Sequence, residues 1–219
     1  MAYVDFISKI HKKTKRDYLQ RVTADKAQCA KIAKKFGVDY WDGDRRYGYG
    51  GFKYDGRWRI VARDIARYYK LKAGMKVLDV GCGKGYLLYD LMQAVPGLQC
   101  QGIDISRYAI AHAKEEVKPF LKQGLAKKLP FKNHSFDLVV SINTLHNLYL
   151  YDLQKALAEI RRVRKSKSYI VLESYRNETE KNNLLNWQLT CECFFTPAEW
   201  KWLFKEFGYP GDYSFIFFE

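Results

Sequence analysis

Apolar and polar residues recur along this chain with two different periods. Residues 57–70 place Trp58, Val61, Ile65 and Tyr68 three or four positions apart, which is the spacing of one face of a helix. Short apolar runs, typical of buried strands, alternate with such helical stretches. These runs cover residues 76–80, 99–105, 136–142, 169–172 and 213–218. The alternation predicts βαβ units and a mostly parallel sheet with helices on both faces.

The first quarter of the chain has a different character. Residues 1–39 are rich in lysine and carry apolar residues at helical intervals, so they predict one or two helices, with Gly37 as a C-terminal stop. Residues 40–56 show no regular period. We therefore expect residues 1–56 to form a basic helical extension with an irregular segment, and residues 57–219 to form one α/β domain.

The net charge is strongly positive and unevenly distributed. The chain of 219 residues carries 38 Lys and Arg against 24 Asp and Glu, a formal charge of +14. Residues 1–75 hold 19 of the basic and 8 of the acidic residues. Such asymmetry indicates an anionic partner, which is a nucleic acid, a phosphorylated small molecule or a membrane surface. The alternative is a solvated lysine-rich helix face.

Several protein classes are disfavoured by composition. No run of 18 apolar residues occurs, so no membrane span is predicted, and the N-terminus lacks the apolar stretch of a secretory signal. Five cysteines are an odd number, which argues against a disulfide framework and favours a cytoplasmic location. Cys191 and Cys193 have no second pair, so we expect no metal site and an alternating strand there.

A glycine-rich loop follows the first predicted strand. Residues 77–85 read Val-Leu-Asp-Val-Gly-Cys-Gly-Lys-Gly, with G-x-G-x-G spacing that is one residue shorter than the dinucleotide fingerprint. The acidic Asp79 before the loop favours a cationic ligand over a phosphate. Asp104 ends the next predicted strand, where a carboxylate can accept both hydroxyls of a ribose.

These features resemble the class I S-adenosylmethionine-dependent methyltransferases. The resemblance runs from about Arg57 to the end of the chain and includes motifs at residues 77–85, 102–106 and 129–139. It implies a Rossmann-like α/β fold with a mostly parallel sheet of seven strands, or of six. The family usually ends with two strands, the last antiparallel, but this chain has one clear candidate, so residues 184–195 contribute a strand or the sheet is shorter by one.

The resemblance also implies S-adenosylmethionine as cofactor and S-adenosylhomocysteine as product. Asp79 would help to hold the ammonium of the cofactor and Asp104 its ribose. Where the family often has an aspartate for the adenine, this chain has Leu125, so apolar or backbone contacts would replace it. The implied cofactor residues are Asp79, Gly81, Cys82, Gly83, Gly85, Asp104, Ile105, Leu125, Ala126, Ser141 and Asn143.

Methyl transfer needs an aligned nucleophile and, where the nucleophile must lose a proton, a base. His146, shortly after the fourth predicted strand, is the best candidate for that base, because a histidine is largely neutral at pH 7. The alternative is a structural histidine beneath a loop. The same region lacks the Asp/Asn-Pro-Pro-aromatic sequence of enzymes that methylate exocyclic amines of nucleic-acid bases, which disfavours that chemistry.

Residues 40–58 combine seven aromatic residues with five glycines. We interpret this segment as a lid over the transfer site, in which Tyr47 and Tyr49 orient the nucleophile or line the pocket. Two alternatives are a structural Ω-loop with buried tyrosines and a platform on which nucleic-acid bases stack. Residues expected to bind an anionic acceptor are Arg45, Arg46 and Arg57. Glu173, at the end of the fifth predicted strand, either orients the acceptor or, as the favoured alternative, is a solvated carboxylate.

The sequence therefore predicts a methyltransferase that acts on a small anionic acceptor, either phosphorylated or nucleotide-linked. O-methylation is slightly favoured over N-methylation on the basis of His146 and the tyrosines. The alternatives are an RNA methyltransferase that uses the basic N-terminal region, and a cofactor-binding interaction protein without turnover.

Overall fold

The computed structural model describes residues 1–11, 16–23 and 25–219. Six strands form one parallel sheet in the order β3-β2-β1-β4-β5-β6. The strand order reverses between β1 and β4, and ligands of such sheets bind beyond the carboxyl ends of the strands at this point. The strands are β1 (Lys76–Val80), β2 (Gln99–Asp104), β3 (Leu121–Gln123), β4 (Phe136–Ile142), β5 (Arg164–Glu173) and β6 (Asp212–Ile216).

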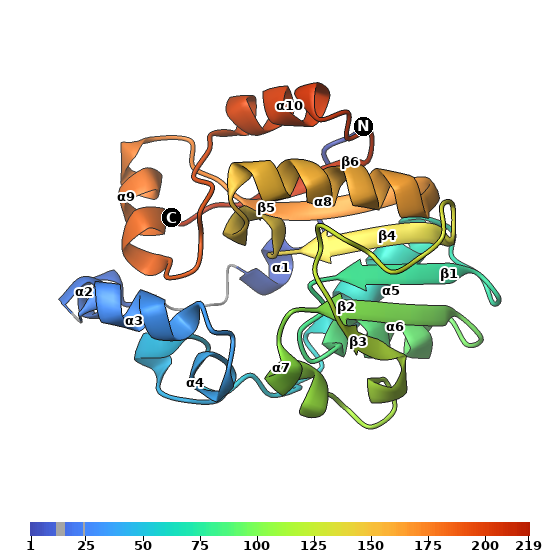
Figure 1. Ribbon diagram of the computed structural model, residues 1–219, viewed down its shortest axis with the longest axis horizontal. Helices are drawn as coiled ribbons and strands as arrows, with labels where there is room; N and C mark the ends of the chain where they lie inside the picture. The colour runs from blue at the N-terminus through green and yellow to red at the C-terminus, as the bar shows by residue number, and fades with distance from the viewer. Residues whose placement is uncertain (12–15, 24) are drawn as a thin grey trace.

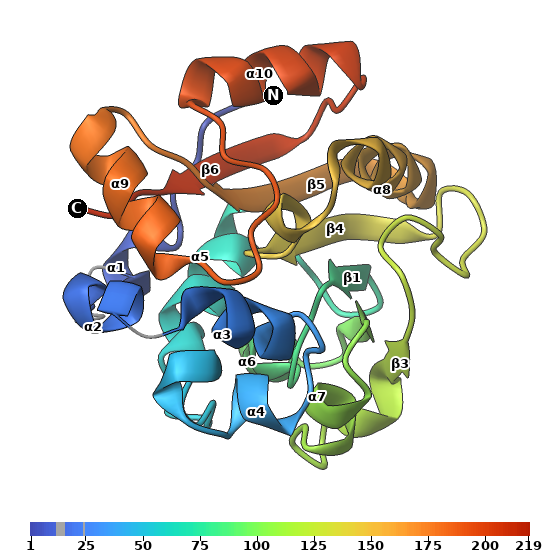
Figure 2. The same cartoon turned by 60° about the vertical axis from the view of Figure 1, so that its left-hand side comes forward.

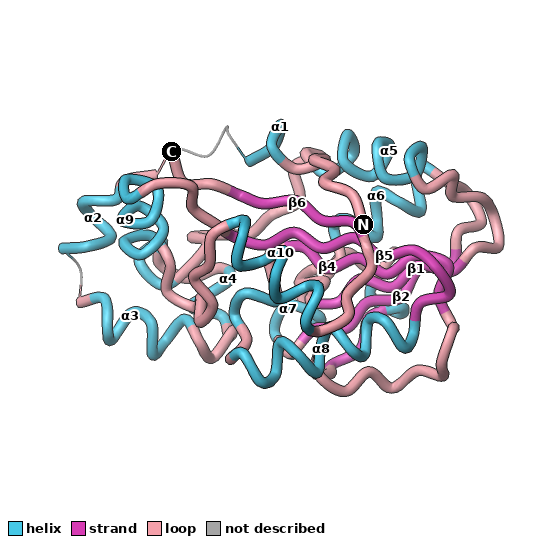
Figure 3. The backbone as a smooth tube through the Cα atoms, turned by 90° about the horizontal axis from the view of Figure 1, so that it is seen from above, coloured by secondary structure: helices cyan, strands magenta, loops and turns pink. Residues whose placement is uncertain are grey.

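Helices cover both faces of the sheet (Figure 3). One apolar layer packs beneath α5 and α6, and the other beneath α8 and α10. None of the described helices is long and apolar enough to cross a membrane. The helices are α1 (Ser8–His11), α2 (Tyr18–Thr23), α3 (Lys26–Ala33), α4 (Val38–Trp41), α5 (Trp58–Tyr68), α6 (Tyr86–Ala94), α7 (Arg107–Ala111), α8 (Leu150–Val163), α9 (Glu178–Trp187) and α10 (Pro197–Glu206), with 3-10 turns η1 (Arg45–Tyr47), η2 (Lys118–Phe120) and η3 (Leu145–Asn147).

The Rossmann-like fold predicted from the sequence is confirmed, with six strands. Residues 184–195 do not form a strand, because α9 continues to Trp187 and the chain is then irregular. The expected alternation of Cys191 and Cys193 across a strand is also wrong. The backbone amides of Glu192 and Cys193 both donate to the carbonyl of His146, so this segment is held by the loop after β4.

The N-terminal region forms short helices at the carboxyl ends of the strands. Helices α2, α3 and α4 lie there together with α9 (Figures 1 and 2). Gly37 does not end a helix as predicted. Helix α3 stops at Ala33, Phe36 adopts a positive φ of 49°, and Gly37 is the N-cap of α4.

The first residues of the chain attach to the edge of the sheet. Tyr3 forms a parallel bridge with Tyr213 of β6, and the amide of Val4 donates to the Tyr213 carbonyl over 2.9 Å. Phe6 is 8% exposed and its ring lies 5.0 Å from that of Tyr169 on β5. The N-terminal segment thus covers part of the edge and of one face.

Substitution of Phe6 by alanine tests this attachment. We expect Phe6→Ala to lower the free energy of unfolding by about 3 kcal/mol, because it removes a large buried ring from the core. Tyr151→Ala is the control, since Tyr151 is 61% exposed and its loss should cost at most about 0.5 kcal/mol. Urea denaturation measures both values, and equal stability of the two variants would contradict the attachment.

Candidate functional site

The glycine loop between β1 and α6 is tightly enclosed. Gly81 and Gly83 have positive φ values of 83° and 53°. A Cβ on Gly81 would lie 2.0 Å from Oγ1 of Thr144, and a Cβ on Gly83 would lie 2.7 Å from the ring of Trp41. Only glycine satisfies both the backbone conformation and the lack of space at these two positions.

Two buried carboxyl groups flank this loop. Both oxygens of Asp104 accept backbone hydrogen bonds of 2.7 Å, one from Gly83 and one from Ser106, so the carboxylate fixes the loop after β1 to the loop after β2. Asp79 is 4% exposed, and its Oδ1 has no hydrogen-bond partner among the described residues. Burial, with a smaller contribution from Asp104, raises the pKa of Asp79 to about 8. An unpartnered buried carboxyl group of this kind fits a cationic ligand.

A small cavity of about 170 Å³ opens beside the loop. Its lining includes Asp79, Gly81, Cys82 and Gly83 from the loop, and Asn143 after β4. Its opposite wall comes from residues 41–58 and from α1. Cofactor residues expected from the sequence thus meet at one site, at the point where the strand order reverses.

The positions expected to flank an adenine are not part of the lining of this cavity. Ile105 is 52% exposed and Leu125 is 43% exposed, and they follow the neighbouring strands β2 and β3. The amide of Gly124 donates to the Asp104 carbonyl over 2.9 Å, which ties the two strand ends together. Two exposed apolar side chains at adjacent strand ends suit contact with a flat aromatic base.

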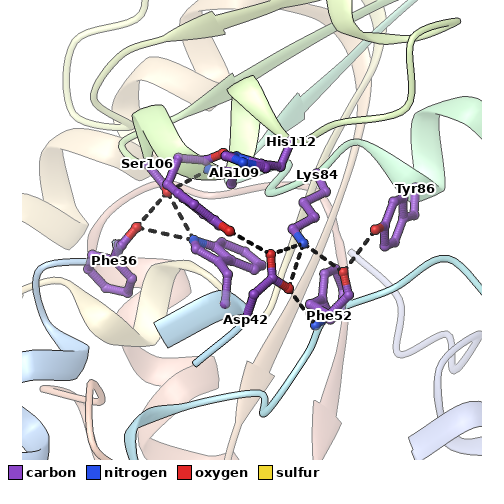
Figure 4. Close-up of polar contacts among 10 residues, drawn as sticks. Phe36, Asp42, Phe52, Lys84, Tyr86, Ser106, Ala109 and His112 are labelled. Carbon is purple, nitrogen blue, oxygen red and sulfur yellow. Dashed lines mark hydrogen bonds and ion pairs between the residues drawn. The ribbon is translucent and has the colours of Figure 1, made fainter. Parts of the chain in front are cut away.

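Residues 40–58, which we call the lid, are attached to the glycine loop by polar contacts (Figure 4). Lys84 is 4% exposed and its Nζ lies 2.7 Å from Oδ2 of Asp42. The same amine donates to the carbonyl of Phe52 over 2.9 Å. Tyr108 donates to the Asp42 carboxylate, and the Trp41 indole donates to Oγ of Ser106 over 2.9 Å.

A larger cavity of about 840 Å³ adjoins the small one. The two cavities share a wall that includes Asn143 after β4, Tyr49 of the lid and Ile10 of α1, so they adjoin at the end of β4 and along the lid. Volumes of 300–1,000 Å³ are typical of small-molecule sites. The larger cavity is basic, with eight Lys and Arg residues in its lining: Lys9, Arg16, Arg21, Arg45, Lys53, Arg57, Arg59 and Arg63.

Three of these arginines surround Trp187 at the end of α9. The guanidinium groups of Arg21, Arg45 and Arg16 lie 4.7, 4.9 and 5.8 Å from its ring centroid. Arg21 is 7% exposed. No ion pair joins these three arginines to an acidic residue within the described parts of the chain. Burial, and then the charge of Arg45, lower the pKa of Arg21. This cluster therefore favours an anion.

The floor of the larger cavity holds a buried histidine and a buried carboxyl group. His146 is 1% exposed, and its Nδ1 accepts the backbone amide of Glu173 over 3.4 Å. Because an amide can only donate, Nε2 carries the ring proton, and it lies 3.4 Å from Oε2 of Glu173. Burial lowers the pKa of His146 to about 3 and raises that of Glu173 to about 8.

Only some of the residues that the sequence predicts to bind the acceptor lie together in the larger cavity. Arg45, Arg57, Tyr49, His146 and Glu173 line the larger cavity. Arg46 and Tyr47 do not, because the Arg46 side chain pairs with Asp44 and stacks on Tyr47 outside the cavity.

Three of the implied cofactor positions have structural roles. Ser141 is fully buried and donates to the carbonyl of Val80 over 2.7 Å, and Gly85 is the N-cap of α6. Ala126 packs against the core beneath α8. These three do not line either cavity, and neither does Asp104, whose carboxylate is held by the two loops.

Sequence reasoning did not identify Arg16, Arg21 and Trp187 as site residues. They come from α9 and from the N-terminal region, and no local spacing links them. The sequence places Lys84 in the glycine loop, but the contact of Lys84 with the lid depends on a residue 42 positions away. Within the described residues, no group of three or more His, Cys, Asp and Glu side chains could hold a metal ion.

Comparison with known protein families agrees with this geometry. Residues 71–208 match the family model described as a methyltransferase domain. The chain belongs to this methyltransferase family. Family and fold together imply S-adenosylmethionine as the methyl donor, and the unpartnered carboxyl group of Asp79 beside the glycine cradle fits its cationic amino-acid end.

Individual relatives match over limited lengths. Sterol 24-C-methyltransferase ERG6B of Gibberella zeae is 36% identical over 117 residues, which are 49% of this chain and 30% of the relative. Demethylmenaquinone methyltransferase of Bacillus cytotoxicus is 35% identical over 113 residues, or 48% and 46%. The chain thus spans less than half the length of either. The YcgJ protein of Bacillus subtilis shares the fold, with a TM-score of 0.54, 23% identity and coverage of 67% and 66%.

The buried carboxyl group of Asp79 predicts a pH-dependent stability. The pKa of Asp79 rises from about 4 in the unfolded chain to about 8 in the folded protein. Its contribution to the free energy of unfolding is therefore complete below pH 4 and is lost as the pH rises through 8. The loss reaches about 1.4 kcal/mol per pH unit. We expect the melting temperature to fall less between pH 5 and 8.5 for Asp79→Asn than for the wild type. An identical fall in both proteins would contradict the assignment.

The contact between Lys84 and Asp42 predicts that the lid opens when the amine is removed. In Lys84→Met, we expect amide hydrogen exchange of residues 40–52 to accelerate about tenfold or more, because hydrogen bonds to a charged group are lost. Lys201→Met on the exposed face of α10 is the matched control. Unchanged protection of the lid in Lys84→Met would show that other contacts hold it.

Proposed function

We propose that this protein transfers a methyl group from S-adenosylmethionine to a small acceptor that carries an anionic group. The observation that supports this most is the arginine-rich cavity that meets the glycine-loop cavity at Asn143. A methyl donor bound at the loop and an acceptor bound among the arginines would face each other at this junction. Phosphorylated and nucleotide-linked compounds belong to the proposed acceptor class.

The residues at the loop are suited to the cofactor. Asp79 would bind its ammonium group, Asp104 its ribose hydroxyls, and Ile105 and Leu125 its adenine. When bound, S-adenosylmethionine supplies an electrophilic methyl group and leaves with the C–S electron pair as S-adenosylhomocysteine. The protein needs to align the acceptor and exclude water, and we propose that the lid does both.

The arginine cluster is suited to the anionic group. Arg16, Arg21 and Arg45 approach one indole ring, and the charge of Arg45 disfavours the charged form of Arg21. A phosphate or carboxylate among them would relieve this repulsion and accept hydrogen bonds from planar guanidinium groups. Arg57 lines both cavities, but its side chain is already paired with Asp55 at 2.6 Å, so we give it a smaller role.

The basic N-terminal region keeps RNA as the second candidate acceptor. The excess of Lys and Arg in residues 1–75 is suited to a phosphate backbone, but several of these arginines point into a cavity of small-molecule size. We therefore favour the small acceptor.

Catalysis by His146 remains a prediction. Its Nδ1 accepts a backbone amide and its Nε2 carries the ring proton, so neither ring nitrogen is available to remove a proton from the acceptor in this arrangement. This geometry supports a positioning role for His146, and it removes the main reason for favouring oxygen as the methylated atom.

A pair of neighbouring arginines tests the acceptor site. We expect Arg45→Ala to weaken binding of pyrophosphate about tenfold or more, because it removes a charged hydrogen-bond donor from the cavity. Arg46→Ala is the matched control and should bind pyrophosphate like the wild type, since Arg46 lies outside the cavity. Calorimetry measures both affinities, and S-adenosylhomocysteine should bind all three proteins equally.

Three results would contradict parts of the proposal. Equal effects of the two arginine substitutions would exclude the cavity as the anion site. Absence of S-adenosylhomocysteine binding to the wild type would exclude the methyltransferase function. Tight binding of a short RNA that weakens by several orders of magnitude between 50 and 200 mM salt would favour RNA as the acceptor.

A further inference from the structure

Within the described chain, two buried oxygen atoms of residues at the floor of the larger cavity accept no hydrogen bond. Glu173 at the end of β5 is 5% exposed. Its Oε1 accepts from Gln188, whereas its Oε2 forms no hydrogen bond within the described chain, although Nε2 of His146 lies 3.4 Å away. Asn143, directly after the neighbouring strand β4, has a buried Oδ1 that is also unpartnered among the described residues. A buried acceptor without a donor costs free energy, so both atoms favour a ligand that donates hydrogen bonds.

The position of these two residues relates them to methyl transfer. Asn143 lines both cavities. Its backbone N–H donates to the carbonyl of Val171 on β5, so the ends of β4 and β5 are adjacent. Its positive φ of 55° is uncommon for a residue with a side chain, although asparagine tolerates it better than most. The chain therefore holds an unpartnered amide oxygen and an unpartnered carboxyl oxygen beside the junction of the cavities.

We infer that the acceptor carries an amino group that binds Glu173 and Asn143, in addition to the anionic group of the proposed function, on which this inference rests. A hydroxyl group has one hydrogen and can satisfy one of the two oxygens. An amine or ammonium group has two or three, and it can donate to both. The positive charge of an ammonium group also pairs with the carboxylate, which no cation contacts directly within the described chain.

The two ends of such an acceptor would lie close together. Arg16 lines the same cavity, and its charge acts on Glu173, opposing the effect of burial on the pKa of that carboxyl group. An acceptor with its anionic group at Arg16, Arg21 and Arg45 and its amino group at Glu173 is therefore a compact zwitterion. Amino sugar phosphates, phosphorylated amino alcohols and amino acids all belong to this class.

Glu173 is also suited to accept the ammonium proton that occupies the lone pair of the acceptor nitrogen, which must be free before the nitrogen can attack the methyl group. An ammonium N–H proton moves to Oε2, the N–H electron pair remains on nitrogen as a lone pair, and the carboxylate becomes a neutral acid. Burial raises the pKa of Glu173 to about 8, which brings it near that of an amine and makes this transfer more balanced than with an exposed glutamate. His146, Gln188 and Arg16 are the polar groups that act on the carboxyl group, and Trp200 donates to its backbone carbonyl.

Matched ligands test the inference without measurement of turnover. Three pairs differ in an amino group replaced by a hydroxyl: glucosamine 6-phosphate and glucose 6-phosphate, phosphoethanolamine and 2-hydroxyethyl phosphate, and β-alanine and 3-hydroxypropanoate. With S-adenosylhomocysteine present, we expect the amine of at least one pair to bind the wild type tenfold or more tightly than its hydroxyl counterpart in calorimetry. Glu173→Gln should lose this preference, and Glu178→Gln on the exposed start of α9 should keep it.

A second variant and a second readout separate recognition from folding. Asn143→Gly keeps the positive φ and removes the amide oxygen, so it should also reduce the preference for the amine. Binding of the amine should release protons at pH 7 in the wild type, because the bound cation favours the ionised carboxyl group, and Glu173→Gln should release fewer. Calorimetry in buffers with different ionisation enthalpies measures this release.

The outcomes distinguish this inference from the proposed function. If hydroxyl ligands bind as tightly as amines in every pair, or if Glu173→Gln keeps the preference, the amino group is excluded while the anionic acceptor stands. If none of the six ligands binds to a protein that binds S-adenosylhomocysteine, the proposed anionic acceptor fails and this inference fails with it.

Discussion

The contact of Lys84 with Asp42 joins the two halves of the site. Lys84 belongs to the glycine loop that follows β1, and Asp42 belongs to the lid, so one buried amine connects the sheet with the N-terminal region. The same amine binds the Phe52 carbonyl, which fixes the lid at a second point. A lysine almost never stays buried without a partner. The acidic lid residue is therefore needed for this loop to fold as it does, and the walls of both cavities depend on it.

The sequence alone predicted those features of the fold that depend on residues close together in the chain. The alternation of strands and helices predicted the parallel sheet, and the three alternating glycines with Asp79 and Asp104 predicted where a nucleoside cofactor would bind. These residues lie at strand ends, and parallel strands bring their carboxyl ends together. Gly81 and Gly83 have positive φ values, as glycine in such a loop allows.

The rest depended on contacts between distant segments. Cys191 and Cys193 had the alternation of a strand, but their segment is held by the carbonyl of His146. Arg46 was indistinguishable from Arg45 in the sequence, although only Arg45 faces the cavity. Trp187 contacts three arginines from two other segments, and the periodicity of the sequence does not predict such contacts. Long-range packing thus decided which of the many basic residues belong to the site.

The bridge between Tyr3 and Tyr213 has a consequence for how ligands reach the interior. The polypeptide is attached to the outer strand at Tyr3, and the lid leads into α5 at Trp58. The lid is also held near its start, where the Trp41 indole donates to Ser106, so it cannot swing aside as a door hinged at one end would. Entry and exit of small molecules then require local loosening along the lid, which makes the strength of its central contacts a determinant of the exchange rate.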